Sequence, residues 1–418
     1  MSSKPKERFP LDELARRLES AKTTGPEGKM AFDGLRYEDL KTVFLTSIEW
    51  DESLSDYQRQ RIARDATFAA AKTGKITKDS LLGAVHDLEA KEFALSEKEY
   101  VVVTSLSLLP DKRLKKTKIR DVEITFHAKL PKQFDRGPLR NPLFLGDTVY
   151  FPERYVVVCV KLSAKSVHAA NSEAMTALNI LRSIWNYTIN SKTGMILRIG
   201  GRLKSEPVNK ILMGPVHTVH LPDGKLAEMM YWYNNLNEQH DPAAFGNDWN
   251  LINRNTKKLL SWYHESSYPK EITDMWIRYV SALDNADSEA AFLKLWSLLE
   301  LLTGTAGDKY DETIRRVLFI CRDREFNRMI LEHLRDRRNA LVHRDDGSQD
   351  VEQYVYQLKR YIQELLRLHL AFRKHFKSLD EFGGFLASPF APEILSERLR
   401  IYRRALDFRQ KTINPPAD

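Results

Sequence analysis

Residues 288–302 read Ser-Glu-Ala-Ala-Phe-Leu-Lys-Leu-Trp-Ser-Leu-Leu-Glu-Leu-Leu, and this stretch decides the fold of the C-terminal part of the chain. Its large apolar side chains recur at helical spacing and form one face, made of Phe292, Leu295, Trp296, Leu299 and Leu302. Three more leucines widen that face almost all round, namely Leu293, Leu298 and Leu301. A helix that is apolar on nearly every side lies inside a bundle, so the sequence predicts a helical bundle centred on this segment.

One acid, Glu300, stands inside the leucine run of this helix. A carboxylate in such surroundings is expected to be buried, and a buried carboxylate must be paired or protonated. Gly304 is the predicted end of the helix, because glycine readily adopts the left-handed conformation that closes helices.

The segments around this helix show the same periodicity. Helices are predicted over residues 256–264, 271–283, 311–321, 326–343 and 351–376. Short connections between them imply antiparallel neighbours, so residues 249–418 are assigned to an all-α antiparallel bundle.

The preceding residues have a different pattern. Short runs rich in β-branched residues predict strands at 100–104, 122–126, 155–160 and 211–213, with a helix over 172–189. Residues 97–248 are therefore predicted to form an α+β domain, and residues 1–96 a mostly helical region with helices at 12–18, 57–72 and from Leu81 onward. The predicted fold class is mixed.

Composition sets further bounds. The chain has 418 residues, a net charge of +8 and two cysteines, which favours a reducing, cytoplasmic location over a disulfide framework or a structural zinc site. No run of about 18 apolar residues is present and the first residues lack an apolar core, so neither a membrane span nor a secretory signal is expected. The positive charge permits an acidic partner such as RNA without demonstrating one.

Arginine is concentrated in residues 315–344, which contain nine arginines, four acids and no lysine. Arginine suits bidentate contacts with phosphate or carboxylate. The alternative, a solvated helix face with internal ion pairs, is favoured for most of the nine. A second basic run, residues 112–120, is expected in an exposed hairpin or loop, and a role in nucleic-acid binding is no better supported there than its absence.

Within the arginine-rich segment, residues 338–343 read Arg-Asn-Ala-Leu-Val-His. On a helix, Arg338 falls on one stripe with Leu331, Leu334, Leu341 and Val342, and an unpaired charge on a buried stripe is unfavourable. Arg338 and His343 diverge by about 140° on that helix. In the alternative interpretation Arg338 pairs with a core acid and His343 caps the helix C-terminus, where a cation is favoured.

Several classes of enzyme lack their signatures here. The sequence contains no phosphate-binding loop, no dinucleotide-binding glycine motif and no nucleophile elbow. His264-Glu265 begins like a zinc-protease helix, but Tyr268 stands where the second histidine would be required. No metal site and no cofactor are expected.

The order of these features resembles a HEPN domain, an α-helical bundle marked by an Arg with a polar residue directly after it and by a His that four to six residues separate from the Arg. The leucine-rich helix with its glutamate, the Arg338-Asn339 pair with His343, the long final helix and the segment 376–382 are similar to the ApeA-like branch in particular. The resemblance covers about residues 250–385. It implies metal-independent RNA cleavage by a homodimer in which two Arg-His helices form one composite cleft.

The resemblance also assigns roles. His343 would act as general base or acid at the ribose 2′-hydroxyl and the leaving 5′-oxygen, and Arg338 would stabilise charge on the phosphate. Asn339 would bind the phosphate or orient His343. Glu300 and Arg335 are supporting candidates, with Glu300 paired either to Arg338 or to another arginine. The candidate RNA contacts are Arg337 and Arg344.

Two functions follow as hypotheses. The first is an endoribonuclease acting on tRNA or mRNA, as a bacterial toxin or antiphage abortive-infection effector, with residues 1–248 sensing a phage-derived or cellular trigger. The alternative is a non-catalytic HEPN module that binds nucleotides or partners. A DNA-binding regulator is less well supported, because no helix-turn-helix pair is evident.

Overall fold

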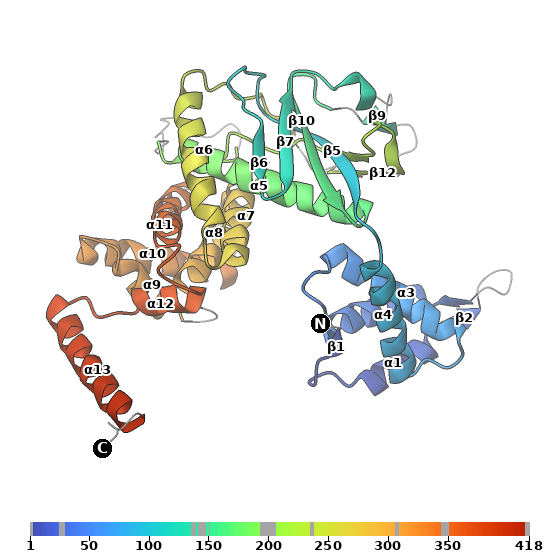
Figure 1. Ribbon diagram of the computed structural model, residues 1–418, viewed down its shortest axis with the longest axis horizontal. Helices are drawn as coiled ribbons and strands as arrows, with labels where there is room; N and C mark the ends of the chain where they lie inside the picture. Colours follow the sequence, from blue (N-terminus) through green and yellow to red (C-terminus); the bar gives the residue numbers. More distant parts are fainter. Residues whose placement is uncertain are drawn as a thin grey trace.

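The chain has a mixed α/β architecture, as the sequence predicts. A computed structural model describes residues 3–24, 30–134, 139–140, 148–149, 151–192, 206–234, 238–305, 309–343 and 351–413. N-terminal helices are followed by a central antiparallel sheet with its own helix, and then by the helical run α6–α13 (Figure 1).

The N-terminal helices form a unit with its own core. They are α1 (Leu11–Ser20), α2 (Gly34–Ser47), α3 (Asp56–Lys72) and α4 (Lys78–Phe93). Two short strand pairs accompany them, β1 (Lys4–Pro5) with β4 (Ile48–Glu49) and β2 (Lys22–Thr24) with β3 (Met30–Phe32). Phe44, Ile62 and Val85 are fully buried between the helices. The sequence patterns predict α1, α3 and α4 but not α2.

The central sheet contains β5 (Lys98–Leu106), β6 (Thr117–Ile119), β7 (Val122–His127), β10 (Val156–Ala164), β11 (Val216–His220) and β12 (Leu226–Tyr233). Its order is β12-β11-β5-β10-β7-β6, with antiparallel neighbours throughout. A separate pair is formed by β8 (Leu139–Arg140) and β9 (Thr148–Val149). The basic run 112–120 lies on a loop and in the exposed β6–β7 hairpin, as expected.

One predicted strand is wrong. Residues 211–213 make only a single bridge, between Met213 and Leu106. The side chains of α5 (Val167–Asn190) bind the backbone there instead: Arg182 and Asn186 both donate to the Ile211 carbonyl, and the Asn186 side-chain oxygen accepts from the Ile211 amide. Both backbone groups of Ile211 are thus satisfied by side chains, so this residue does not need a strand partner, whereas the Leu212 carbonyl and Met213 pair with the backbone at the end of β5.

Alternation along the strands gives the sheet two different faces. Val102, Val158 and Val160 lie on the face that packs against α5. Their neighbours Val103 and Cys159 point the opposite way into a smaller cluster with Phe134. This is the two-residue period of a strand, and it places α5 between the sheet and the C-terminal helices (Figure 1).

The C-terminal helices are α6 (Asp248–His264), α7 (Pro269–Leu283), α8 (Ser288–Thr303), α9 (Tyr310–Leu318), α10 (Arg324–His343), α11 (Val351–Ala371), α12 (Leu379–Leu386) and α13 (Pro392–Ile413). The predicted central position of α8 is confirmed, since Phe292, Leu295 and Leu299 are fully buried. Gly304 ends α8 with a φ of 64°, the left-handed conformation that glycine tolerates.

Helix α11 ends five residues before the predicted Phe376. The aromatic side chains that follow α11 pack against α12, where Phe372 and Phe376 both contact the Phe385 ring. Helical periodicity continued through these phenylalanines, but ring packing against α12 determines where the helix stops.

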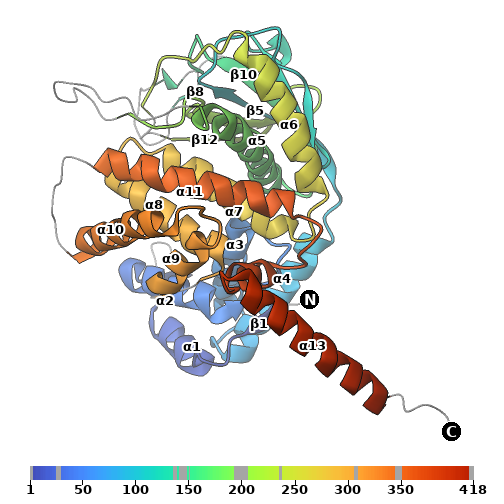
Figure 2. The ribbon, with the colours of Figure 1, turned by 90° about the vertical axis from the view of Figure 1, so that its left-hand side faces the viewer.

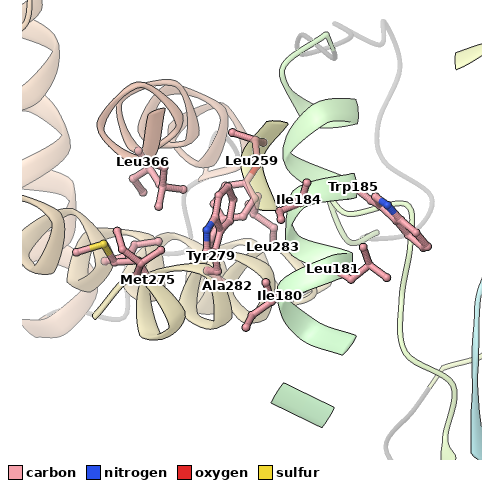
Figure 3. Packing of buried hydrophobic residues seen from close by; sticks show 14 of the residues in the cluster. Ile180, Leu181, Ile184, Trp185, Leu259, Met275, Tyr279, Ala282, Leu283 and Leu366 are labelled. Atoms are coloured by element: carbon pink, nitrogen blue, oxygen red, sulfur yellow. The ribbon is translucent and has the colours of Figure 1, made fainter. Parts of the chain in front are cut away.

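The bundle and the sheet share one continuous core. Ile180 and Ile184 of α5 point toward Tyr279 and Leu283 of α7, whereas Trp185 points to the other side of α5 (Figure 3). There Trp185 packs against Phe126 of β7 and Trp249 of α6. Helix α5 therefore packs against both layers, and its side chains belong to the core that the sheet and the bundle share.

His369 joins α11 to α8 and to Tyr268 through two hydrogen bonds. It is completely buried in α11, and its Nε2 donates to the Leu302 carbonyl at the end of α8. Because that nitrogen carries the proton, Nδ1 accepts the hydrogen bond from the Tyr268 hydroxyl, at 3.0 Å. Burial lowers the pKa of His369 to about 4, despite the opposing effect of the hydrogen bond to Leu302.

This histidine predicts a pH-dependent stability. Unfolded His369 titrates near 6.5 and folded His369 near 4, so the unfolded chain binds the proton first and stability falls as the pH drops below 6.5. Between pH 7 and pH 5 the loss from this residue is about 2 kcal/mol. Chemical denaturation at pH 7 and pH 5 should show that the free energy of unfolding falls by about 2 kcal/mol more in wild type than in His369→Gln. An equal fall in both proteins would contradict the assignment.

Within the described residues, no helix combines the length and the apolar character needed to cross a membrane.

Candidate functional site at the end of α10

The candidate site lies on the last turns of α10. Leu331 and Leu334 are fully buried, so the first half of the predicted stripe faces the core. Farther along, Leu341 is half-buried and Val342 is 50% exposed, so the stripe does not continue inward to the end of the helix. Arg338 therefore sits where α10 emerges from the core, and it is half-buried.

Arg338 is held by an aromatic ring and an amide. Its guanidinium carbon lies 4.7 Å from the centre of the Tyr310 ring, at the start of α9. Its Nη1 donates to the Asn339 side-chain oxygen at 3.3 Å. Among the described residues it forms no ion pair, so the alternative in which a core acid neutralises it finds no support there. A guanidinium stacked on a ring keeps most of its N–H donors available for an anion.

Behind Tyr310 the cluster continues to Glu300. The Tyr310 ring meets the Trp296 ring edge-on at 6.2 Å, and Trp296 Nε1 donates to Glu300 Oε1 at 2.8 Å. Glu300 is half-buried, less enclosed than expected, because it lies at the border of the α8 core. In the described part of the chain no ion pair joins Glu300 to Arg338. Two aromatic rings connect them instead.

The other candidates occupy different surroundings. Arg335 Nη1 forms an ion pair with Asp311 of α9 at 2.7 Å, and Nη2 lies 3.1 Å from Asp336. Arg337 points to another face of α10, where its guanidinium lies over the Tyr354 ring of α11 at 5.5 Å. The structure thus brings Arg338, Asn339 and Glu300 into one cluster but not Arg337.

His343 is the last residue of α10. Its side chain, and Arg344 as a whole, lie outside the described residues.

Several arginines of the rich segment are structural. Arg315 donates to the Ala387 carbonyl, and Arg316 donates to the Thr303 carbonyl while pairing with Glu312. Arg324 lies over the Phe390 ring. These contacts agree with the interpretation that most of the nine arginines stabilise the bundle rather than bind a ligand.

Sequence reasoning missed Tyr310 and Trp296. Trp296 had a local signal, because it lies four residues before Glu300 on the same helix and such pairs are neighbours. Tyr310 had none, since its contact with Arg338 arises only from the packing of α9 against α10. No group of three or more His, Cys, Asp or Glu side chains that could hold a metal ion is found within the described ranges.

The contact between Arg338 and Tyr310 can be measured through stability. A partly desolvated cation–π pair contributes about 1 kcal/mol. Chemical denaturation of wild type, Arg338→Ala, Tyr310→Ala and the double variant should give a coupling energy of that size. Tyr310→Phe keeps the ring and should preserve the coupling, whereas additive single effects would show that the two side chains do not interact.

Comparison of the chain with protein-family models, with curated proteins and with solved structures finds no match.

Proposed function

We propose that the chain is a HEPN-type endoribonuclease that cleaves RNA by attack of a ribose 2′-hydroxyl, at a site built around Arg338 and His343. The observation that carries the proposal is the environment of Arg338. A half-buried arginine stacked on Tyr310, with no carboxylate partner among the described side chains, is suited to receive a phosphate.

The sequence supports the same chemistry. His343 follows Arg338 by five residues at the end of one helix, and an imidazole titrates in the pH range needed to move the proton of a 2′-hydroxyl. Arg338 would bind the phosphate and stabilise the charge that grows on its oxygens. Asn339 would hold the guanidinium in place through the hydrogen bond that it already accepts.

Glu300 enters this proposal as a positioning residue. It fixes Trp296, Trp296 packs on Tyr310, and Tyr310 lies under Arg338. Arg335, which is paired with Asp311, would keep α9 and α10 together. In the wider proposal, the cleavage serves a toxin or antiphage function and residues 1–248 sense the trigger.

Products distinguish this chemistry from hydrolysis by activated water. Full-length protein incubated with end-labelled RNA should leave a 2′,3′-cyclic phosphate and a 5′-hydroxyl. A DNA strand of the same sequence should remain intact, because it lacks the attacking hydroxyl. One 2′-deoxy substitution at the cleaved position should block the cut there. Products with a 5′-phosphate would contradict the mechanism.

The alternative function is RNA or nucleotide binding without cleavage. It uses the same phosphate contact at Arg338, so a binding assay alone cannot separate the two. Full-length protein that retains RNA on a filter, with binding lost in Arg338→Ala, but that cuts neither purified nor total cellular RNA would favour this non-catalytic module.

A further inference from the structure

Helix α13 extends away from the rest of the molecule (Figures 1 and 2). Every residue from 392 to 410 is exposed along its whole described length. Seven large apolar side chains are more than a third exposed on it. At helical spacing, one side of α13 holds Ile394, Ile401 and Phe408, and a second side about 100° away holds Leu395, Leu399, Tyr402 and Leu406. A helix of this kind gains most of its stability from packing its apolar face, so α13 requires a surface to cover it.

The same chain carries a second exposed apolar surface in the bundle. Among the described residues of α6–α12, the large apolar side chains classed as exposed all belong to α10: Phe326 at 56%, Met329 at 65% and Val342 at 50%. Phe326 and Met329 lie on one outer face, on the side away from the buried Leu331 and Leu334. Neither α10 nor α13 covers the other within one chain (Figure 2).

We infer that α13 of one chain packs antiparallel on the outer face of α10 in a second copy. Charge supports this pairing. Glu332 and Asp336 stand four residues apart on one flank of the Phe326–Met329 face. Arg400 and Arg404, also four apart, stand on the same flank of the α13 face that holds Ile394, Ile401 and Phe408.

The direction of the contact follows from these flanks. In both helices the charged pair lies on the same side of the apolar face when the helix is viewed from its N-terminus. Two such sides meet when the helices pack antiparallel and lie on opposite sides of the contact when they pack parallel. The acids then face the arginines, with Glu332 opposite Arg404 and Asp336 opposite Arg400, and Phe408 comes opposite residue 328, between Phe326 and Met329. Within the described ranges none of the arginines of α13 forms an ion pair, whereas Glu332 pairs with Arg328 and Asp336 with Arg335, both on α10 itself, and the two acids are 44% and 67% exposed. Their charges are accessible to a second chain.

The position of the segment that precedes α13 excludes packing of α13 on α10 of the same chain. In this register the first residue of α13 lies beyond the C-terminal end of α10, about 30 Å along the axis from Arg324. Phe390 stands two residues before α13, and the Arg324 guanidinium lies 4.7 Å from the centre of its ring. Phe390 also stacks on Phe319. Chain connectivity therefore places the start of α13 at the wrong end of its own α10.

Two symmetric contacts result, because each copy offers one α13 and one α10. The inner side of α10, with Arg338 over Tyr310, stays uncovered by this contact. The inference goes beyond the proposed function, since it concerns association alone and would stand for a chain that cuts no RNA.

Sedimentation of the full-length protein in the absence of RNA tests the contact. Wild type should be a dimer, and Arg404→Glu should raise the dimer dissociation constant about tenfold or more, because it places an acid opposite Glu332. Arg403→Glu makes the same change of charge on the opposite side of α13 and should leave the constant unaltered. Glu332→Arg combined with Arg404→Glu should restore it.

A cross-link tests the register. Glu332→Cys and Arg404→Cys in one chain should give a covalent dimer under mild oxidation, and Glu332→Cys with Arg403→Cys should not. A wild-type chain that stays monomeric, or a dimer insensitive to Arg404→Glu, overturns the inference. So does a monomer that binds phosphatidylglycerol vesicles through α13, which would make an anionic bilayer the surface that covers this helix.

Discussion

Arg338→Ala and His343→Ala should each lower the rate of RNA cleavage by at least about a hundredfold. Loss of a general acid or base commonly slows a reaction by two to four orders of magnitude, and loss of a donor to a developing oxyanion by two to three. The structure supports the role of Arg338 more directly than that of His343, because the Arg338 guanidinium is already positioned over Tyr310. Cleavage by wild type should continue in EDTA. The measurement is the initial rate on end-labelled RNA.

Matched controls separate chemistry from folding. Arg328→Ala removes a half-exposed arginine from the same helix, and His264→Ala removes an exposed histidine from the end of α6. Both should cut RNA at nearly the wild-type rate. Wild-type activity in Arg338→Ala or His343→Ala would show that the site lies elsewhere, provided that both variants keep the wild-type melting temperature.

An excess of inactive chain should suppress the wild type. If each site takes His343 from both copies, a tenfold excess of His343→Ala leaves about one wild-type chain in eleven paired with another by random exchange. Cleavage per wild-type chain should then fall about tenfold. The experiment mixes the two proteins, allows exchange, and measures the initial rate against the same excess of albumin.

The α13 contact supplies the control for this experiment. Adding Arg404→Glu to the His343→Ala chain weakens its pairing with wild type. The rate of cleavage per wild-type chain should then fall less than it does with His343→Ala alone. An undiminished rate with the simple His343→Ala chain would mean that each copy cuts RNA alone. An equally large drop with both inactive chains would keep the composite site but assign the contact between copies to other residues than Arg404.

Much of the architecture was predictable from local patterns. The near-complete apolar surface of residues 288–302 identified α8 as the central helix, and it is fully buried at Phe292, Leu295 and Leu299. Runs of β-branched residues located β5, β7 and β10. The strand predicted at residues 211–213 is wrong for a specific reason, because Arg182 and Asn186 of α5 satisfy the backbone at Ile211.

The candidate site was predictable only in part. Arg338 and Asn339 were found from their spacing relative to His343, and their neighbourhood was expected to be a buried stripe with Glu300 as an enclosed partner. The stripe instead ends at a half-exposed Val342, and Glu300 is half-buried and bound to Trp296. Helical periodicity gives the direction of a side chain but not the point at which neighbouring helices stop covering it.

The sequence by itself located helices α6–α11 and strands β5, β7 and β10, and it placed Arg338, Asn339 and His343 on the end of one helix. Tertiary structure alone decided that Tyr310 lies beneath Arg338, that Arg335 is paired with Asp311, and that α13 leaves the bundle with its apolar face exposed. The physical reason is the range of the interactions. Periodicity and capping act within a few residues, whereas these contacts join elements whose packing depends on the whole bundle.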